Sequence, residues 1–364
     1  MIQQRIHKIQ ASLRGRGLDA ILITEPSNRR YLSGYTPADH GIQESSGVLL
    51  IPKKGGPFLL TDSRFELQAK EEAAGFRVEL YRKGLSLLLK TLLPSLDVKR
   101  LAFESHYMLH SSVGRMETVL GKQVELVPLT GLVEQLREVK SEEEISLLRA
   151  SVRRNEEVFQ QALGRIKTGI TEIDLALALD TTMRQHGAER PSFDTIVAFG
   201  ANAAKPHAVP SNRVLQENEL VLIDMGLVLD GYCSDMTRTL FHGQPDSMFL
   251  ERLRTARKAQ LAAVKAIRAG AVCRDVDQAA RQVINDAGYG RCFGHGLGHG
   301  VGLAVHEAPR LSPRCRKRLR AGMIVTIEPG IYIPGWGGIR LENMAVVRDN
   351  GCELLNEDTT GLDL

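Results

Sequence analysis

The sequence has few of the features that would place a protein outside the ordinary globular class. Only five of its 364 residues are cysteines, and no two of them form a C-x-x-C pair. Neither a disulfide framework nor a zinc knuckle is therefore predicted. No window reaches the run of about 18 apolar residues that a membrane-spanning helix needs, and the first 17 residues lack the apolar core of a signal peptide. We therefore expect a cytoplasmic protein with no membrane partner.

Long blocks of one charge sign are also missing. The 47 basic and 43 acidic residues are intermixed and give a formal net charge of +4. This distribution does not predict a nucleic-acid partner, because such proteins usually gather basic residues on one face. Cys292 with His295 would make only half of a zinc site, since no second thiol lies nearby in the sequence.

The length and the pattern of the chain predict two domains. A chain of 364 residues is long for a single core. Residues 1–131 alternate between helical and extended patterns, which predicts a small α/β domain. Helices are expected over 3–14 and 63–74, strands over 19–24, 47–51, 57–60, 77–81, 100–103 and 123–127, and helical segments between the last of these strands. The second domain is placed at 132–364.

Long helices open the second domain. A helix is predicted over residues 132–139, and another from Ser141 to about Gly164. Ser141 is followed by three glutamates, of which Glu144 stands at the N3 position of a capping box.

An internal repeat follows. Shifted by 101 positions, residues 162–190 lie over 263–291, with identical pairs such as Gly169 with Gly270 and Asp174 with Asp275. Each copy reads as a helix, a glycine and a second helix, and extended stretches over 219–241 and 323–347 follow them. A helix C-cap used twice would explain only part of this agreement. We therefore predict an α+β domain made of a duplicated helix-helix-hairpin unit with antiparallel sheet.

Four carboxylates and one imidazole have contexts that suit a metal site. Two divalent cations would nearly balance the charge of such a set, and hard oxygen ligands suit these ions. The five candidates are Asp224, Asp235, His299, Glu328 and Glu342.

The two aspartates are expected to meet on one hairpin. Asp230 and Gly231 form a strong two-residue turn, which would put residue 226 opposite Asp235. Asp224 and Asp235 would then be diagonal neighbours on one face. Asp224 lies in an apolar strand, where an unpaired carboxylate would cost several kcal/mol. A cation or a full set of hydrogen bonds is therefore required there, and either reading is open.

The two glutamates are expected to form a matching pair on the second hairpin. Glu328 ends an apolar strand and is followed by Pro329 and Gly330, which stop the ladder. Glu342 is placed on a returning strand over 339–347. Two facing hairpins would therefore bring four carboxylates to one cleft.

Glycine occupies every second position from Gly294 to Gly302, with His295 and His299 between. A helix is disfavoured there, because each interior glycine costs roughly 1 kcal/mol relative to alanine. An extended ribbon would let the backbone approach a ligand while both imidazoles project on one side. The residues favour His299 as a metal ligand without fixing that choice. Taken alone, His207 and His306 would be ordinary surface or packed histidines.

Six motifs taken together resemble one known family, the pita-bread metallopeptidases. The motifs are 223–226, 233–239, 298–302, 305–307, 327–332 and 339–342. Their order and spacing are similar to those of the proline-specific branch, Xaa-Pro aminopeptidases and Xaa-Pro dipeptidases (prolidases). Residues 1–131 are similar to the N-terminal domain that this branch shares with creatinase. Asn343 and Met225 depart from common family residues, and neither is a ligand position.

The resemblance implies roles for particular residues. It makes the five candidates the ligands of two divalent ions, commonly manganese or cobalt, with zinc or iron as alternatives. It makes His207, His295 and His306 active-site histidines. Glu328 would also carry protons during catalysis, and Tyr332, Arg340 and Thr237 would support the ligands from behind. Relatives are commonly homodimers, which is the expected state here.

The resulting prediction is an enzyme that cleaves the peptide bond before proline at the N-terminus of peptides. A dipeptidase is the alternative, in which an arginine of the basic stretch 310–320 would bind the free carboxylate after proline. That stretch is equally explained as a solvated loop. A catalytically silent binding module is a third reading, which the presence of all five ligand residues disfavours. Creatine hydrolysis is disfavoured for the same reason.

Overall fold

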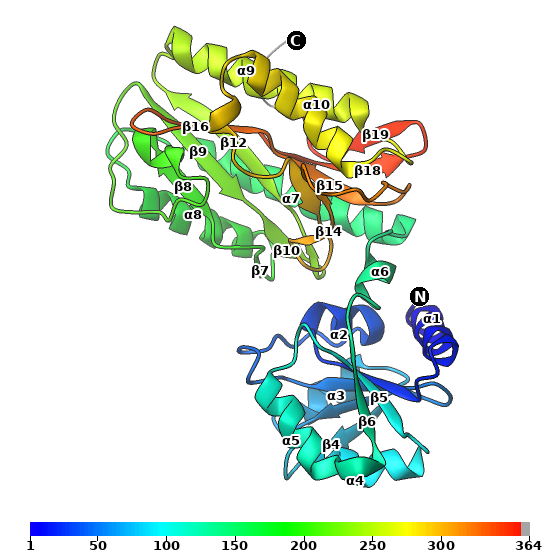
Figure 1. Ribbon diagram of the computed structural model, residues 1–364. Helices are drawn as coiled ribbons and strands as arrows, with labels where there is room; N and C mark the ends of the chain where they lie inside the picture. Colours follow the sequence, from blue (N-terminus) through cyan, green and yellow to red (C-terminus); the bar gives the residue numbers. More distant parts are fainter. Residues whose placement is uncertain (358–364) are drawn as a thin grey trace. The chain divides into compact units, whose positions relative to one another are not determined.

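The computed structural model describes residues 1–357, and the chain divides into two compact units (Figure 1). The first comprises Met1–Arg137, and the second begins at Glu138. The division falls beyond residue 131 because the segment up to Arg137 is held by the first unit. Arg137 Nη1 donates to Asn28 Oδ1 over 2.7 Å, and Tyr31 OH donates to the Leu136 carbonyl over 3.3 Å.

The first unit is built on one six-stranded sheet with the strand order β4-β3-β2-β1-β5-β6. Its strands are β1 (Ala20–Ile23), β2 (Val48–Pro52), β3 (Phe58–Thr61), β4 (Arg77–Leu80), β5 (Arg100–Glu104) and β6 (Glu125–Leu129). β1 runs parallel to β5, and only β2 runs antiparallel to its neighbours. The α/β class predicted for this region is confirmed.

Helices cover this sheet, and one of them was not predicted. The helices are α1 (Ile2–Gly15), α2 (Pro26–Ser33), α3 (Glu66–Glu72), α4 (Leu85–Ser95) and α5 (His110–Leu120). The unpredicted helix is α2, which begins with a proline at its first turn while Glu25 accepts from the Ser27 and Asn28 amides. The predicted helix over 63–74 is shortened to α3. The predicted helix over 132–139 is wrong in extent, because only the single turn α6 (Glu134–Arg137) forms there.

The second unit contains the predicted duplication (Figure 1). In the first copy, α7 (Glu142–Leu163) is followed by α8 (Glu172–Gln185), and in the second copy α9 (Ser247–Ala266) is followed by α10 (Cys273–Asp286). The bounds of α8 and α10 are offset by 101 residues at both ends, as the sequence repeat requires. The predicted capping box is present, since Ser141 Oγ accepts from the Glu144 amide and Glu144 Oε2 accepts from the Ser141 amide.

Each helix pair is followed by a long antiparallel hairpin that changes sheet halfway along. In the first copy, β9 (Glu219–Met225) pairs with β12 (Met236–His242), and β10 (Leu227–Leu229) continues the hairpin with β11 (Tyr232–Cys233). In the second copy, β15 (Ile324–Ile327) pairs with β18 (Asn343–Arg348), and β16 (Gly330–Ile333) continues with β17 (Gly337–Arg340). The strand predicted over 339–347 is therefore two strands, interrupted at Leu341 and Glu342.

Shorter strands complete the sheets of the second unit. β8 (Ile196–Phe199) flanks β9, and β7 (Arg190–Pro191) flanks β10. β13 (Gly298–Gly300) lies between β14 (Glu307–Leu311) and β15, and β19 (Gly351–Leu354) lies beside β18.

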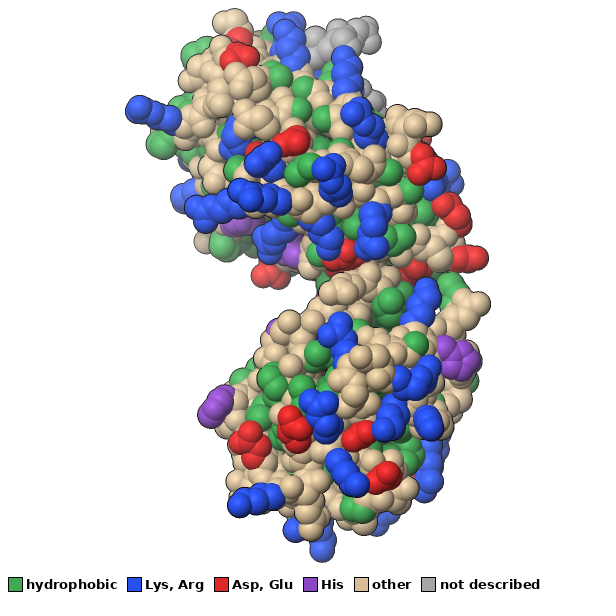
Figure 2. Space-filling model, turned by 45° about the vertical axis from the view of Figure 1, so that its right-hand side comes forward, with side chains coloured by type: hydrophobic (Ala, Val, Ile, Leu, Met, Phe, Trp, Pro, Cys, Tyr) green, Lys and Arg blue, Asp and Glu red, His purple; other side chains and the backbone are tan. Residues whose placement is uncertain are grey.

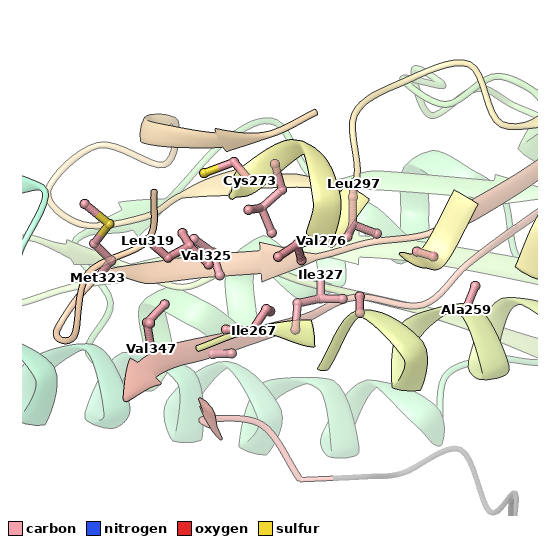
Figure 3. Close-up of a cluster of buried hydrophobic side chains, with 14 of the residues drawn as sticks. Ala259, Ile267, Cys273, Val276, Leu297, Leu319, Met323, Val325, Ile327 and Val347 are labelled. Atoms are coloured by element: carbon pink, nitrogen blue, oxygen red, sulfur yellow. The ribbon is translucent and has the colours of Figure 1, made fainter. Parts of the chain in front are cut away.

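Apolar side chains from the helices of each copy pack on the hairpin of the same copy. Figure 3 shows the second of these clusters, in which side chains of α9 and α10 meet those of β15 and β18. Its labelled members include Ala259, Val276, Val325, Ile327 and Val347, and all are less than 2% exposed. This burial fixes the face of β15 that points to the helices, so the hairpin end that carries Glu328 is held rigidly.

The charged residues lie mainly at the surface. Lys and Arg side chains spread over the visible faces of both units, with Asp and Glu side chains among them (Figure 2). Within the described residues, no helix is both long and apolar enough to cross a membrane.

Candidate metal centre

The first hairpin places Asp224 and Asp235 as the sequence predicted. Its turn residues, Asp230 and Gly231, have φ values of 50° and 84°, which are typical of a type I′ turn. Leu229 pairs with Tyr232, and Asp224 pairs with Thr237. In that register Asp235 stands two residues before Thr237, so the two aspartates are diagonal neighbours on one face. Asp224 is 8% exposed and Asp235 is 3% exposed.

The second hairpin places Glu328 and Glu342 where its ladder changes sheet. Glu328 directly follows β15, and Glu342 directly precedes β18. Ile327 pairs with Asn343 and Gly330 pairs with Arg340, so one register runs through the break and sets the two glutamates opposite each other. Both hairpins therefore carry two acids at their breaks. At the break predicted at Pro329, the Glu328 and Glu342 amides donate instead to the Leu297 and Thr237 carbonyls, over 2.9 and 3.1 Å.

His299 lies on β13, where glycines allow very close packing. A Cβ atom at Gly298 would lie 2.1 Å from the Thr326 carbonyl oxygen, and one at Gly300 would lie 2.3 Å from the Ala308 carbonyl oxygen. Only glycine fits at these two positions, as the extended ribbon requires. The His299 amide is bound by Thr326 Oγ1 over 3.0 Å, and His299 Nδ1 lies 3.1 Å from the Gly300 carbonyl oxygen. The other ring nitrogen, Nε2, is left to face the acids.

One cavity of about 570 Å³ collects the candidate residues. It is lined by all five candidate ligands, by the three candidate histidines and by Arg340: Asp224, Asp235, His299, Glu328, Glu342, His207, His295, His306 and Arg340. The structure thus brings together residues that are spread over more than 130 positions of the sequence.

The ligand atoms are close without bonding to one another. His299 Nε2 lies 3.5 Å from both Asp235 Oδ2 and Glu328 Oε1. Asp235, His299 and Glu342 each offer one possible ligand atom, and these three atoms all lie within 4.8 Å of one another. These separations are too long for good hydrogen bonds and are short enough for the atoms to share an ion.

Three of the acids in this cavity are destabilised in their charged form by burial and by one another. Burial, followed by the charge of Glu342, raises the pKa of both Asp235 and Glu328 well above the usual range. Burial, followed by the charge of Asp224, raises the pKa of Glu342 to about 8. Carboxylates that repel one another in a buried space are stabilised by bound cations.

An orphaned oxygen supports the same conclusion. Among residues 1–357, Asp224 Oδ1 is buried and has no hydrogen-bond partner, while Asp224 Oδ2 accepts from Arg340 Nη2 over 2.6 Å. A buried carboxylate oxygen without a donor costs free energy, which a cation would recover. The donor set of carboxylates and one imidazole therefore fits divalent ions such as manganese, cobalt, iron or zinc.

Three histidines of the cavity, His295, His299 and His306, have lowered pKa values, which favours their neutral form. Burial lowers the pKa of His295 to about 4, and burial followed by the charge of His306 lowers that of His299 to about 4. Burial, followed by the charge of Arg310, also lowers the pKa of His306. A neutral imidazole is the form that binds metals and hydrogen-bonds a substrate carbonyl.

Supporting residues stand directly behind the acids. Thr237 Oγ1 donates to Glu342 Oε2 over 2.7 Å, and Arg340 Nε donates to Thr237 Oγ1 over 3.0 Å. Arg340 Nη1 donates to Tyr332 OH over 2.8 Å, and Tyr332 OH lies 3.0 Å from His295 Nε2. The three residues predicted to support the ligands therefore form one connected network with them.

Two contributors were missed by the sequence analysis. Arg238 is 4% exposed and donates to the Glu342 carbonyl over 2.6 Å. Thr326 Oγ1 binds the His299 amide and donates to Glu328 Oε1 over 3.3 Å. A signal existed for Thr326, since a hydroxyl side chain within an otherwise apolar strand requires a partner. Arg238 stands between two threonines and gave no such signal.

A second acidic cluster lies in the first unit. Glu104, His106 and Glu134 each offer one possible ligand atom, and these three atoms also lie within 4.8 Å of one another. Glu104 is fully engaged, because its Oε2 accepts from the Thr24 and Glu25 amides and its Oε1 accepts from Asn28. This cluster contains half as many carboxylates as the cavity of the second unit, and Glu134 accepts from Asn28 through Oε1 while its buried Oε2 has no hydrogen-bond partner among the described residues.

Comparisons with known proteins agree with this architecture. Residues 146–349 match the model of metallopeptidase family M24, and residues 5–139 match the creatinase/prolidase N-terminal domain. The chain therefore belongs to metallopeptidase family M24, the pita-bread metallopeptidases, and is a metallopeptidase with a creatinase-type N-terminal domain.

Individual relatives cover nearly the whole chain. The uncharacterized peptidase YqhT of Bacillus subtilis is 38% identical over 92% of both chains. The Xaa-Pro dipeptidase from Bacillus anthracis has a TM-score of 0.93 and 35% identity, covering 100% of this chain and 99% of its own. The X-Pro aminopeptidase from Thermotoga maritima has a TM-score of 0.86 and 35% identity, covering 94% and 96%. The predicted resemblance to the proline-specific branch and the predicted fold class are confirmed.

Proposed function

We propose that the enzyme hydrolyses the peptide bond before proline at the N-terminus of peptides, using two divalent metal ions. The observation that carries this proposal is the single cavity in which four acids, His299 and three further histidines converge. The family supplies the metal-dependent peptidase chemistry. Solved relatives at 35% identity that are named for Xaa-Pro substrates support the proline specificity.

The metal pair would be held by Asp224, Asp235, His299, Glu328 and Glu342. When bound, two such cations supply Lewis acidity and an attacking water of lowered pKa. We propose manganese or cobalt as the ions, with zinc or iron as alternatives. The excess of buried carboxylates and the orphaned Asp224 oxygen support this ligand set.

Glu328 is the proposed proton carrier. Its raised pKa suits a group that accepts a proton from water and returns it near neutral pH. Glu328 Oε1 is positioned by Thr326, and its side chain reaches the cavity. The proton it takes would go to the departing proline nitrogen, which carries no hydrogen of its own in the peptide.

The histidines are proposed to handle the substrate. His306 packs edge-on against His299, with 4.4 Å between ring centroids, and would donate to the carbonyl oxygen as negative charge develops there. His207 and His295 line the same cavity and would close on the peptide. Tyr332 and Arg340 would keep His295 and Asp224 in place.

A second candidate function, an Xaa-Pro dipeptidase, is favoured by the position of Arg310. This arginine belongs to the basic stretch 310–320, and it lines the cavity. An exposed guanidinium there would suit the free carboxylate of a dipeptide.

Substrate length separates the two candidates. The purified enzyme, loaded in turn with manganese, cobalt and zinc, would be assayed on Leu-Pro and on Leu-Pro-Gly. Cleavage of the tripeptide at a rate similar to or above that of the dipeptide supports an aminopeptidase, and cleavage of the dipeptide alone supports a dipeptidase. Absence of cleavage of either peptide with every metal contradicts the proline-specific function. Size-exclusion chromatography would test the homodimer that we also propose.

A further inference from the structure

Two buried carboxylates outside the cavity each hold a segment that carries an active-site histidine. Glu172 begins α8 in the first copy of the duplicated unit, and Asp277 lies in α10 of the second copy. Both side chains are 0% exposed. Neither lines the cavity. A buried carboxylate must be bonded, and the partners of these two are informative.

Glu172 grips the segment on both sides of His207. Before the histidine, Glu172 Oε1 accepts from the Phe199 amide over 2.8 Å and from Asn202 Nδ2 over 3.0 Å. After it, Glu172 Oε2 accepts from the Ser211 amide over 3.0 Å and from Ser211 Oγ over 2.6 Å. The segment 199–211 is thereby closed into a loop with His207 between its two attachment points.

Asp277 grips the segment on both sides of His295 with the help of Arg281. Asp277 Oδ1 accepts from the Leu297 amide over 3.0 Å, and both of its oxygens accept from Arg281 over 2.9 Å. Arg281 then donates to the carbonyls of Phe293 and His295, over 2.9 and 2.7 Å.

The Arg281 guanidinium also stacks on an aromatic ring of the segment. It lies 4.2 Å from the centroid of the Phe293 ring. The segment 293–297 contains glycines and little regular structure, so these contacts take the place of a strand ladder.

We propose that Glu172 and the pair Asp277 and Arg281 are positioning residues for His207 and His295 respectively. This inference rests on the proposed function, because the two histidines are taken as substrate-handling groups. Each copy of the duplication thus holds its own histidine from its second helix. The two copies use non-equivalent helix positions for this, since position 277 corresponds to Ala176 in the first copy.

Local hydrogen exchange tests the proposal without any assay of activity. In Glu172→Gln we expect amide exchange to quicken over 199–211 and to stay unchanged over 293–297. In Asp277→Asn we expect the reverse. Exchange that quickens equally in both segments, or in neither, overturns the inference whatever the substrate of the enzyme proves to be.

Double-mutant kinetics test the link to catalysis. We expect each single variant to lower kcat roughly 10- to 100-fold, since a small misplacement of a catalytic group has effects of this size. Glu172→Gln should add little to His207→Ala, and its effect on His295→Ala should be nearly multiplicative; the opposite pattern is expected for Asp277→Asn. If Glu172→Gln coupled equally to His207→Ala and to His295→Ala, and Asp277→Asn did the same, the variants would be loosening the fold in general. That result would overturn the inference.

Gentler variants and controls keep the test decisive if either variant folds poorly. Ser211→Ala removes the hydrogen bond from the Ser211 hydroxyl to Glu172. Arg281→Lys keeps the positive charge but cannot donate to the Phe293 and His295 carbonyls at the same time, as a guanidinium does. Asp174→Asn and Asp275→Asn change exposed acids of α8 and α10, and should match the unmodified enzyme in exchange and kcat. Failure of the unmodified enzyme on prolyl peptides would contradict the proposed function, and the exchange pattern would still decide the positioning roles.

Discussion

The two acidic clusters of this protein differ in how their buried charge is satisfied. In the first unit, Glu104 receives two backbone amides and the Asn28 side chain, and Glu134 receives Asn28 and lies 3.0 Å from His106. In the second unit, burial and the charges of neighbouring acids raise the pKa values of Asp235, Glu328 and Glu342, and these carboxylates receive few donors. Proximity of acids and a histidine is common to both. Within residues 1–357, each cluster holds one buried carboxylate oxygen without a hydrogen-bond partner, Glu134 Oε2 and Asp224 Oδ1. The larger number of buried acids that repel one another distinguishes the cluster that we assign to metal.

The largest expected effect tests this assignment directly. Changing Asp235 to Asn, or His299 to Ala, removes a ligand from the centre of the acidic set, so metal content and turnover should fall by several orders of magnitude. Metal analysis by mass spectrometry and peptide assays would measure both, with circular dichroism to verify the fold. A variant that keeps its full metal content would indicate that the cluster in the first unit binds the ion, which reverses the comparison.

Glu328→Gln should separate chemistry from metal binding within the second cluster. The amide keeps one oxygen toward the ions but cannot carry a proton. We expect kcat to fall roughly 100- to 10,000-fold while most of the metal is retained. The control is Glu217→Gln, which alters an exposed acid of the same unit outside the ligand set. Near-normal turnover of Glu328→Gln with metal bound would contradict the role of Glu328.

Metal removal should change the pH dependence of stability. In the metal-free protein, burial and the charge of Asp224 raise the pKa of Glu342 from its ordinary value of 4.5 to about 8, so the folded state holds an extra proton and loses stability as pH rises from about 4.5 to 8. Below 6.5, His295 and His299, with folded pKa values of about 4, lower the stability as pH falls, which opposes the carboxylate effect.

Melting temperatures from pH 5.5 to 9 would measure this profile. We expect stability to fall between about pH 6.5 and 8 without metal and a flatter curve with it. Loaded metal should also add about 2.7 kcal/mol to the free energy of unfolding at 100 times its dissociation constant. Identical profiles with and without metal would contradict the metal centre.

The smallest effect is expected in the first cluster. Burial raises the pKa of Glu104 to about 7, so ionisation of Glu104 destabilises the fold as pH rises from about 4.5 to 7. Glu104→Gln removes this dependence of stability on pH. It also leaves one of the donors to Glu104 without a good acceptor, which lowers the free energy of unfolding by about 1–3 kcal/mol. We expect a melting temperature lower by a few degrees, with metal content and kcat unchanged. A loss of activity would show that the comparison between the clusters is wrong.

Much of the architecture was predictable because it is local. Ser141 and Glu144 signalled a capping box, Asp230 and Gly231 a type I′ turn, and the 101-residue repeat a duplicated unit. The misses have local causes as well. Helix α2 begins at a proline in a polar stretch. The helix expected over 132–139 is reduced to α6, because Val139 forms a β-bridge with Met323, far along the chain, instead of continuing the helix.

The sequence by itself determined the family, the two hairpins and the identities of the candidate ligands, since turn chemistry and motif spacing depend on neighbouring residues. Only the tertiary structure decided which polar groups meet. Residues far apart in the chain are joined by the hydrogen bonds from Arg340 to Asp224, from Ser211 to Glu172 and from Leu297 to Asp277. The Asp224 oxygen that has no partner among the described residues is likewise a result of the packing. Such contacts arise from the packing of whole helices against hairpins, and periodicity carries no record of them.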